Sequence, residues 1–141
     1  MTRVDFYILQ GDDAHTRPLF ACRLAEKAYV LGHRVYIHTE SATQTAHLDE
    51  LLWTFKQDGF LPHAVQGTEQ DAPSPILLGH TGEPDTNTDV LINLAPEVPL
   101  FFSRFERVAE LIDQQEQRKR QGRERYSFYR DRGYELQTHQ L

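Results

Sequence analysis

The chain has 141 residues, a formal net charge of −6, 26% charged residues and 11% aromatic residues. These values are typical of one ordinary soluble domain, residues 1–141, and exclude a disordered chain. No apolar run approaches the roughly 20 residues that cross a bilayer, and the N-terminus lacks a signal-peptide pattern. Cys22 is the only cysteine, which excludes an intrachain disulfide. We therefore expect a cytoplasmic protein without membrane contact.

Five short apolar segments, rich in β-branched and aromatic residues, predict the strands of a sheet. Each of the first two is followed by a helical pattern after a short link, and this strand–helix–strand–helix order favours right-handed crossovers and mainly parallel pairing. Segment 107–112, RVAELI, fits a strand or a helix by periodicity alone. We predict a strand there, because one more strand then completes the sheet before the C-terminal helix. The predicted strands are residues 4–9, 34–38, 76–79, 89–94 and 107–112.

Helix boundaries are marked by capping residues. Asp13 or Thr16 is suited to cap a helix that ends at Gly32, and Ser41 with Gln44 predicts a capping box for the next helix. The loop before the first helix, GDDAHT, has one glycine and two aspartates, whereas a phosphate loop needs several glycines and no anions. We therefore predict no nucleotide-binding loop and no cofactor.

Tests for catalytic and metal sites are negative at the level of sequence. The seven histidines show no H-x-x-x-H spacing, and Cys22 has no second thiol with which to hold zinc. No G-x-S-x-G nucleophile elbow is present, and the carboxylate pair Asp12–Asp13 is adjacent rather than convergent. We expect no metal and no catalytic activity, and an enzyme of α/β type ranks third among the possible functions.

The C-terminal stretch 118–134, RKRQGRERYSFYRDRGY, concentrates positive charge. It holds seven of the 15 basic residues and two acidic ones, which gives it a formal net charge of +5. The rest of the chain has a formal net charge of −11. This asymmetry places a cationic surface on an otherwise acidic protein. The stretch contains no proline, and its composition predicts a helix.

On that helix, tyrosines and glycines share one side and arginines occupy the adjacent row. The rings should therefore pack against the protein, with guanidinium groups at the edge of the same seam. Such a groove suits an apolar side chain that carries a carboxylate, because arginine can meet both carboxylate oxygens. The alternative is a solvated basic helix that is docked by its tyrosines. The row of tyrosines and glycines is Gly122, Tyr126, Tyr129 and Gly133. The adjacent row is Arg123, Ser127 and Arg130.

A second unusual stretch, WTFKQDGFLPH at 53–63, clusters Trp53, Phe55, Phe60, Leu61 and Pro62. Large apolar residues at a helix end often cap a core. The competing interpretation is an exposed anchor for a protein partner, since aromatic residues supply much of the energy of protein interfaces.

Several segments, in this order over nearly the whole chain, resemble the chi subunit of bacterial DNA polymerase III. They are DFYIL, LDELLWTF, GFLPH, DVLINL and GRERYSFYRDRGYEL. The most specific parts are LW, with F-x-P-H following seven residues after the tryptophan, and the R-E-R-Y…Y-R…G-[FY] ending.

The resemblance implies a Rossmann-like three-layer α/β fold without nucleotide binding and a non-catalytic accessory role in DNA replication. It implies two partners. One is the psi subunit, through which chi joins the clamp loader. The other is the acidic C-terminal tail of the single-stranded DNA-binding protein, which ends in a phenylalanine with its free carboxylate. DNA would be contacted only indirectly.

The resemblance also assigns residues. Arg123 is the charge partner of the tail, and Tyr126 walls the pocket for its terminal ring. Ser127 stands where the best-studied chi proteins carry a lysine, so one cationic contact is missing, and Arg130 or Arg120 is left to compensate. The implied psi contacts are Trp53, Phe60, Leu61 and Pro62.

The alternative function is direct binding of single-stranded nucleic acid through the basic helix, with arginines on phosphates and aromatic rings stacked on bases. The acidic remainder of the chain argues against it, because it would repel a long strand.

Overall fold

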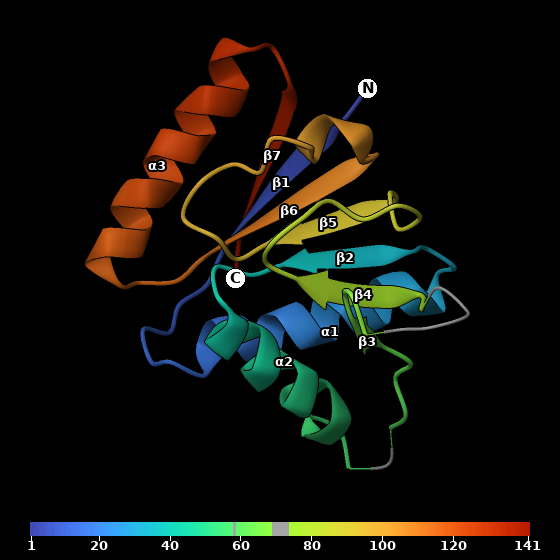
Figure 1. Cartoon of the computed structure of the whole chain (residues 1–141). Helices are drawn as coiled ribbons and strands as arrows, with labels where there is room; N and C mark the ends of the chain where they lie inside the picture. Colours follow the sequence, from blue (N-terminus) through green and yellow to red (C-terminus); the bar gives the residue numbers. More distant parts are fainter. Residues whose placement is uncertain (58, 69–73) are drawn as a thin grey trace.

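Seven parallel strands form one sheet in a computed structural model that describes residues 1–57, 59–68 and 74–141 (Figure 1). Their order across the sheet is β3-β4-β2-β5-β6-β1-β7, and all five predicted strands are confirmed. The strands are β1 (Arg3–Ile8), β2 (Val35–His38), β3 (Ala64–Val65), β4 (Ile76–Gly79), β5 (Val90–Asn93), β6 (Arg107–Ile112) and β7 (Glu135–Gln140).

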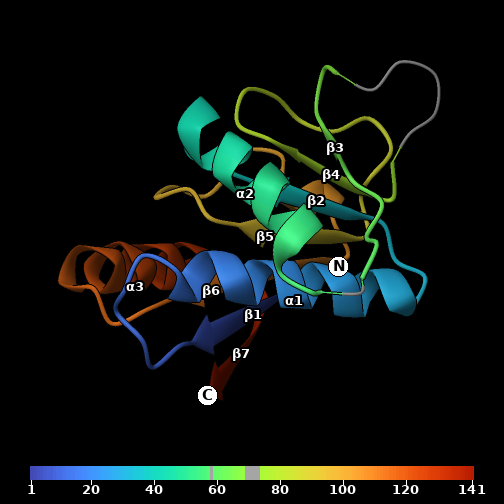
Figure 2. The same ribbon diagram turned by 90° about the horizontal axis from the view of Figure 1, so that it is seen from below.

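Helices on both faces of the sheet make three layers (Figures 1 and 2). Helices α1 (Thr16–Val30) and α2 (Ala42–Thr54) cover one face, and α3 (Glu116–Asp131) covers the other together with a short 3-10 helix, Phe102–Arg104. Side chains alternate between the two cores along each strand. In β2, Val35 and Ile37 pack under α1 and α2, while Tyr36 packs on the α3 side. The predicted three-layer α/β fold is confirmed.

The predicted helix caps are present. The Asp13 carboxylate accepts hydrogen bonds from two backbone N–H groups at the start of α1, at 2.9 and 3.0 Å. Gly32, with φ +88°, follows the end of α1. The Ser41 hydroxyl accepts a hydrogen bond from the N–H of Gln44 at 3.1 Å, and the Gln44 side chain accepts one from the N–H of Glu40 at 2.8 Å. The box therefore closes one residue earlier than predicted.

Two strands, β3 and β7, are absent from the sequence-based prediction, and the expectation that the sheet is complete before the basic helix is wrong. α3 ends at Asp131, so Gly133 lies beyond it rather than on its inner side. There Gly133 adopts φ +80°, a conformation that favours glycine, and the chain turns back into β7. β7 then pairs in parallel with β1, and Leu136 lies beside Val4.

A buried carboxylate in β6 anchors α3 to the sheet. Glu110 is fully buried and accepts hydrogen bonds from Arg125 Nε and from the Tyr129 hydroxyl, each at 2.8 Å. Asn93 Nδ2 donates to the same carboxylate at 3.0 Å, and Arg125 Nη1 donates to the carbonyl of Pro96 at 2.8 Å. Burial raises the pKa of Tyr129, and the Glu110 charge raises it further, so the hydroxyl remains a donor. These contacts fix the position of α3 along the sheet and its rotation.

We expect Glu110→Gln to lower the free energy of unfolding by about 3–5 kcal/mol, because Arg125 would stay buried without its anion. Urea denaturation measures the change. Glu124→Gln, on the exposed side of the same helix, is the matched control and should change stability by less than about 0.5 kcal/mol. Equal unfolding midpoints for the two variants would show that the pair does not anchor α3.

A second buried carboxylate, Asp5 in β1, holds β7 and β6 beside it. One Asp5 oxygen lies 3.0 Å from His139 Nε2 and 3.1 Å from Arg3 Nη2, and the other lies 2.9 Å from Arg107 Nη2. The His139 ring stacks on Tyr7 with centroids 4.7 Å apart. Burial raises the pKa of Asp5, but the contacts with His139, Arg107 and Arg3 outweigh burial and hold the pKa below its usual value.

At neutral pH, Asp5→Asn should lower the free energy of unfolding by about 1–3 kcal/mol. This loss is smaller than for a fully buried ion pair, because the three partners of Asp5 are partly exposed to solvent. Because the folded-state pKa of Asp5 lies below the unfolded value of about 3.9, its stabilisation is complete above that value and is lost as the pH falls through the folded pKa. In urea unfolding, the difference in the free energy of unfolding between wild type and Asp5→Asn should therefore become smaller below about pH 4. Asp12→Asn, at an exposed position, is the control. A stability difference between wild type and Asp5→Asn that does not depend on pH would contradict the stabilising role of the Asp5 carboxylate.

Candidate functional site

A groove of about 250 Å³ runs between α3 and the β1–β7 edge of the sheet. Its floor is apolar and is formed by side chains of β1 and β6. Its walls come from α3 on one side and from the polar side chains of β7 on the other. The lining residues are Phe6, Ile8, Ile112, Gln114, Lys119, Gly122, Arg123, Tyr126, Thr138 and Gln140.

The depth of the groove depends on how closely α3 approaches the sheet. A Cβ atom at Gly122 would lie 2.6 Å from Cδ1 of Ile112, so a larger residue would force the Ile112 side chain or the helix to shift. Tyr126 is half-buried, and its ring meets the ring of Phe6 edge-on, with centroids 5.2 Å apart. The groove therefore has a firm aromatic wall over an apolar floor.

Two cations lie on the helix side of this groove. Arg123 is exposed and forms no ion pair within 4.0 Å among the residues that the structure describes. Lys119 lies one turn earlier on α3, and its Nζ is 3.5 Å from a carboxylate oxygen of Glu116 in solvent, a weak pair. Positive charge beside an apolar floor suits an anionic group attached to an apolar one. Sequence reasoning missed Lys119, although its spacing of four from Arg123 on a helix was a usable signal.

The four predicted tail-binding residues are only partly brought together. Arg123 and Tyr126 line one groove, as the helical spacing indicated. Ser127 and Arg130 do not contribute to its lining. Ser127 is half-buried, and Arg130 is exposed, with Nη2 3.2 Å from a carboxylate oxygen of Asp131.

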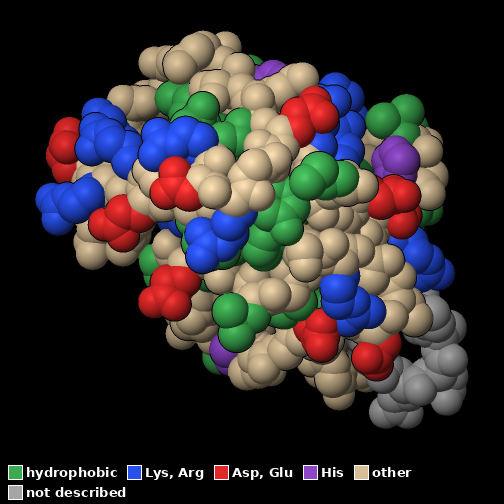
Figure 3. All heavy atoms as spheres, turned by 90° about the horizontal axis from the view of Figure 1, so that it is seen from above, with side chains coloured by type: hydrophobic (Ala, Val, Ile, Leu, Met, Phe, Trp, Pro, Cys, Tyr) green, Lys and Arg blue, Asp and Glu red, His purple; other side chains and the backbone are tan. Residues whose placement is uncertain are grey.

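Much of the positive charge of the C-terminal stretch is paired within the fold. Arg118 Nη2 lies 2.7 Å from a carboxylate oxygen of Asp113, and Arg125 is buried against Glu110. On the face drawn in Figure 3, basic side chains gather over the α3 side, with acidic ones between them. This arrangement weakens the case for direct nucleic-acid binding, which needs a continuous cationic track.

Residues 53–57 and 59–63 carry a second exposed surface, which we call the Trp53 surface: Trp53, Phe60 and Pro62. Trp53 is 50% exposed and Phe60 is 71% exposed, and their ring centroids are 5.5 Å apart. Pro62, two residues after Phe60 in the chain, is half-buried. Leu61, in contrast, is 4% exposed and belongs to the core under α1 and α2. The stretch thus caps the core with Leu61 and the partly buried Phe55, and it presents two aromatic rings to solvent.

Beside the rings, an open cavity of about 570 Å³ is bounded by α2 and β3. The His63 ring packs against Trp53, with ring centroids 4.5 Å apart. The His63 Nε2 lies 3.2 Å from a carboxylate oxygen of Asp49. α2 packs near the β3–β4 edge of the sheet, while α3 packs near the β6–β7 region. The groove and the Trp53 surface are therefore far enough apart to be occupied at the same time.

Within residues 1–57, 59–68 and 74–141, no group of three or more His, Cys, Asp or Glu side chains is placed to hold a metal ion. None of the helices in these ranges has the length and apolar character needed to span a bilayer. Cys22 is fully buried, and burial raises the pKa of its thiol to about 12, so the thiol stays protonated and unreactive at neutral pH.

Comparison with known proteins gives a consistent result. The family described as DNA polymerase III chi subunit, HolC, matches residues 1–137. A Pseudomonas aeruginosa protein named DNA polymerase III subunit chi is 43% identical over 141 residues, which is 100% of this chain and 98% of the relative. Proteins of the same name from Haemophilus influenzae and Escherichia coli are 34% and 28% identical, over 94% and 98% of this chain and 93% and 97% of their own lengths. The chain therefore belongs to the family of DNA polymerase III chi subunits.

Proposed function

We propose that the protein is a non-catalytic accessory subunit of the replicative DNA polymerase III that acts by binding two other proteins. Its groove binds the C-terminal tail of the single-stranded DNA-binding protein. Its Trp53 surface binds the psi subunit, through which it joins the clamp loader in the cytoplasm. DNA is then contacted only through these proteins. The observation that supports tail binding most strongly is that Arg123 and Tyr126 line one groove with an apolar floor.

The groove fits a peptide end that carries an aromatic ring and a free carboxylate. The ring would lie on Phe6, Ile8 and Ile112 against Tyr126, where it is removed from water. The carboxylate and any acidic side chains before it would meet Arg123 and Lys119. A flexible tail loses entropy when it docks, so we expect micromolar affinity. Several tails on one coated strand compensate for this by raising the effective concentration.

We infer that Lys119 supplies the cationic contact that Ser127 does not. The serine leaves a neutral position where a second cation was expected, and Lys119 supplies positive charge to the same groove from one turn earlier. Arg130 lies further along α3 and is exposed, so we assign it to acidic residues outside the groove. The charged contact with the tail is then shared by Arg123 and Lys119.

We expect Arg123→Ala to weaken binding of a tail peptide about ten-fold or more, because a charge-assisted contact is lost. Lys119→Ala should weaken it less, about two- to five-fold, since the lysine is more loosely held. Isothermal titration calorimetry on the full chain measures both. Arg23→Ala, which removes an exposed arginine of α1, is the matched control and should leave the affinity unchanged.

Salt provides a second check on the same contact. Higher ionic strength should weaken the binding of wild type more than that of Arg123→Ala, because salt screens the charge that the variant has already lost. If the affinity of Arg123→Ala equals that of wild type at both salt concentrations, Arg123 is not part of the tail site.

The Trp53 surface has the composition of a protein interface. Two exposed aromatic rings in contact, next to an open cavity, form an apolar patch that a soluble protein seldom leaves uncovered. Aromatic residues of this kind provide much of the energy in known interfaces. Leu61 is buried in the core, so it would act by holding its chain neighbours Phe60 and Pro62 in place rather than by touching psi.

Trp53→Ala and Phe60→Ala should remain folded, because both side chains are largely exposed, and should lose most of their co-purification with psi. Circular dichroism verifies the fold, and pull-down of co-expressed psi measures binding. Leu100→Ala, which removes the most exposed leucine, is a control of the same chemical type and should bind psi normally. Folded Trp53 and Phe60 variants that recover psi as well as Leu100→Ala does would exclude this surface.

A further inference from the structure

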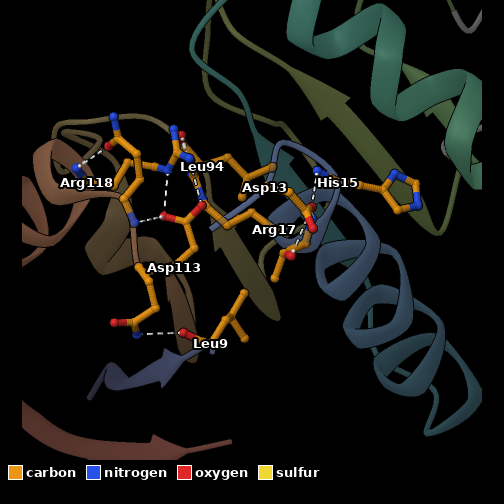
Figure 4. A network of polar contacts seen from close by, with 10 residues as sticks. Leu9, Asp13, His15, Arg17, Leu94, Asp113 and Arg118 are labelled. Carbon is orange, nitrogen blue, oxygen red and sulfur yellow. Dashed lines mark hydrogen bonds and ion pairs between the residues drawn. The ribbon is translucent and has the colours of Figure 1, made fainter. Parts of the chain in front are cut away.

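A second pocket lies on the opposite flank of α3 from the groove, between the starts of α1 and α3 (Figure 4). It has a volume of about 190 Å³ and is bounded by Leu94 and Ala95 after β5. Three arginines line it: Arg17 from the first turn of α1, and Arg118 and Arg125 from α3. The pocket is at the carboxyl edge of a parallel sheet, where α/β folds bind their ligands.

Two of these arginines have carboxylate partners in the fold. Arg118 donates from Nε and Nη2 to the two oxygens of Asp113, at 2.8 and 2.7 Å. Arg125 donates to Glu110 at 2.8 Å. Their charges are therefore largely balanced before any ligand arrives.

Arg17 differs from both. It is only 9% exposed, and its Nη2 donates to the carbonyl of Leu94 at 2.9 Å. Its Nε is buried without a hydrogen-bond partner, and among the described residues it forms no ion pair within 4.0 Å. Burial and the nearby charge of Arg118 lower the pKa of Arg17 to about 10, so it is still protonated at neutral pH. A buried cation that forms no ion pair is unfavourable, and an anion in the pocket would relieve this cost.

We propose that this pocket binds a phosphate group, with Arg17 as its main ligand. The planar guanidinium matches two oxygens of a phosphate at once, and the side-chain amides of Gln117 and Gln121 bring further N–H donors to the same pocket. The volume corresponds to about six waters at ~30 Å³ each, which suits a phosphate group with some of its hydration. These donors are side chains of two helices, so the site needs no glycine loop.

The site is tested by titrating the ¹⁵N-labelled full chain with inorganic phosphate at constant ionic strength, with chloride as the replaced anion. We expect saturable shifts of the Arg17 Nε–Hε signal and of the backbone signals around the pocket. Arg17→Gln should weaken phosphate binding about ten-fold or more. Arg23→Gln, an exposed position of the same helix, should not change it. Unsaturable shifts in wild type, or equal affinity in Arg17→Gln, would overturn the proposal.

A second variant keeps the test decisive if Arg17→Gln does not fold. Glu40 is exposed on the rim of the pocket, where its carboxylate repels an anion. Glu40→Gln should tighten phosphate binding about two- to five-fold without loss of structure. Unchanged or weaker phosphate binding in a folded Glu40→Gln protein would count against the site.

The source of the phosphate is resolved by competition. A 5′-phosphorylated oligonucleotide that displaces inorganic phosphate better than its 5′-hydroxyl form would assign the pocket to a nucleic-acid end, and equal competition would assign it to a free phosphate or small ester. The site is independent of the tail groove, so Arg17→Gln should bind the tail peptide as wild type does.

Discussion

The ion pair between Glu110 and Arg125 determines where α3 lies on the sheet. Apolar contact alone is non-directional and leaves a helix free to slide along a flat surface. The hydrogen bonds of Arg125 and Tyr129 to one fully buried carboxylate remove that freedom, because they are satisfied at a single position and rotation. α3 carries Lys119, Arg123 and Tyr126 on one flank and Arg118 and Arg125 on the other. Both pockets therefore depend on this one buried pair.

The basic stretch of the sequence serves three separate purposes in the fold. Arg125 and Arg118 are used internally, against Glu110 and Asp113. Arg132 covers the ring of Phe128, with its Cζ 3.6 Å from the centroid. Arg123 remains for the rim of the groove. A local charge balance read from sequence thus overstates the cationic surface, because it counts arginines whose partners come from distant strands.

The features that the sequence predicted well are those coded locally. The apolar strands, the Asp13 and Ser41 caps, and the shared helix side of Arg123 and Tyr126 all follow from composition or spacing along the chain. β7 could not be found in this way, because ELQTHQ is mostly polar and becomes a strand only by pairing with β1. Arg17 and the floor of the groove were missed for a similar reason: their neighbours lie on other elements. Glu110 was visible as a charge inside an apolar strand, but its partner was not.

The parallel pairing of β1 with both β6 and β7 has a consequence for how the protein folds. Arg3 lies beside Arg107 on one side and Glu135 on the other, so the first strand to be synthesised has no neighbour until the last third of the chain exists. At roughly 5–20 residues per second, ribosomes leave that apolar strand unpaired for several seconds. Such long-range contacts slow folding, and the unpaired apolar strand is exposed to aggregation until its neighbours are made.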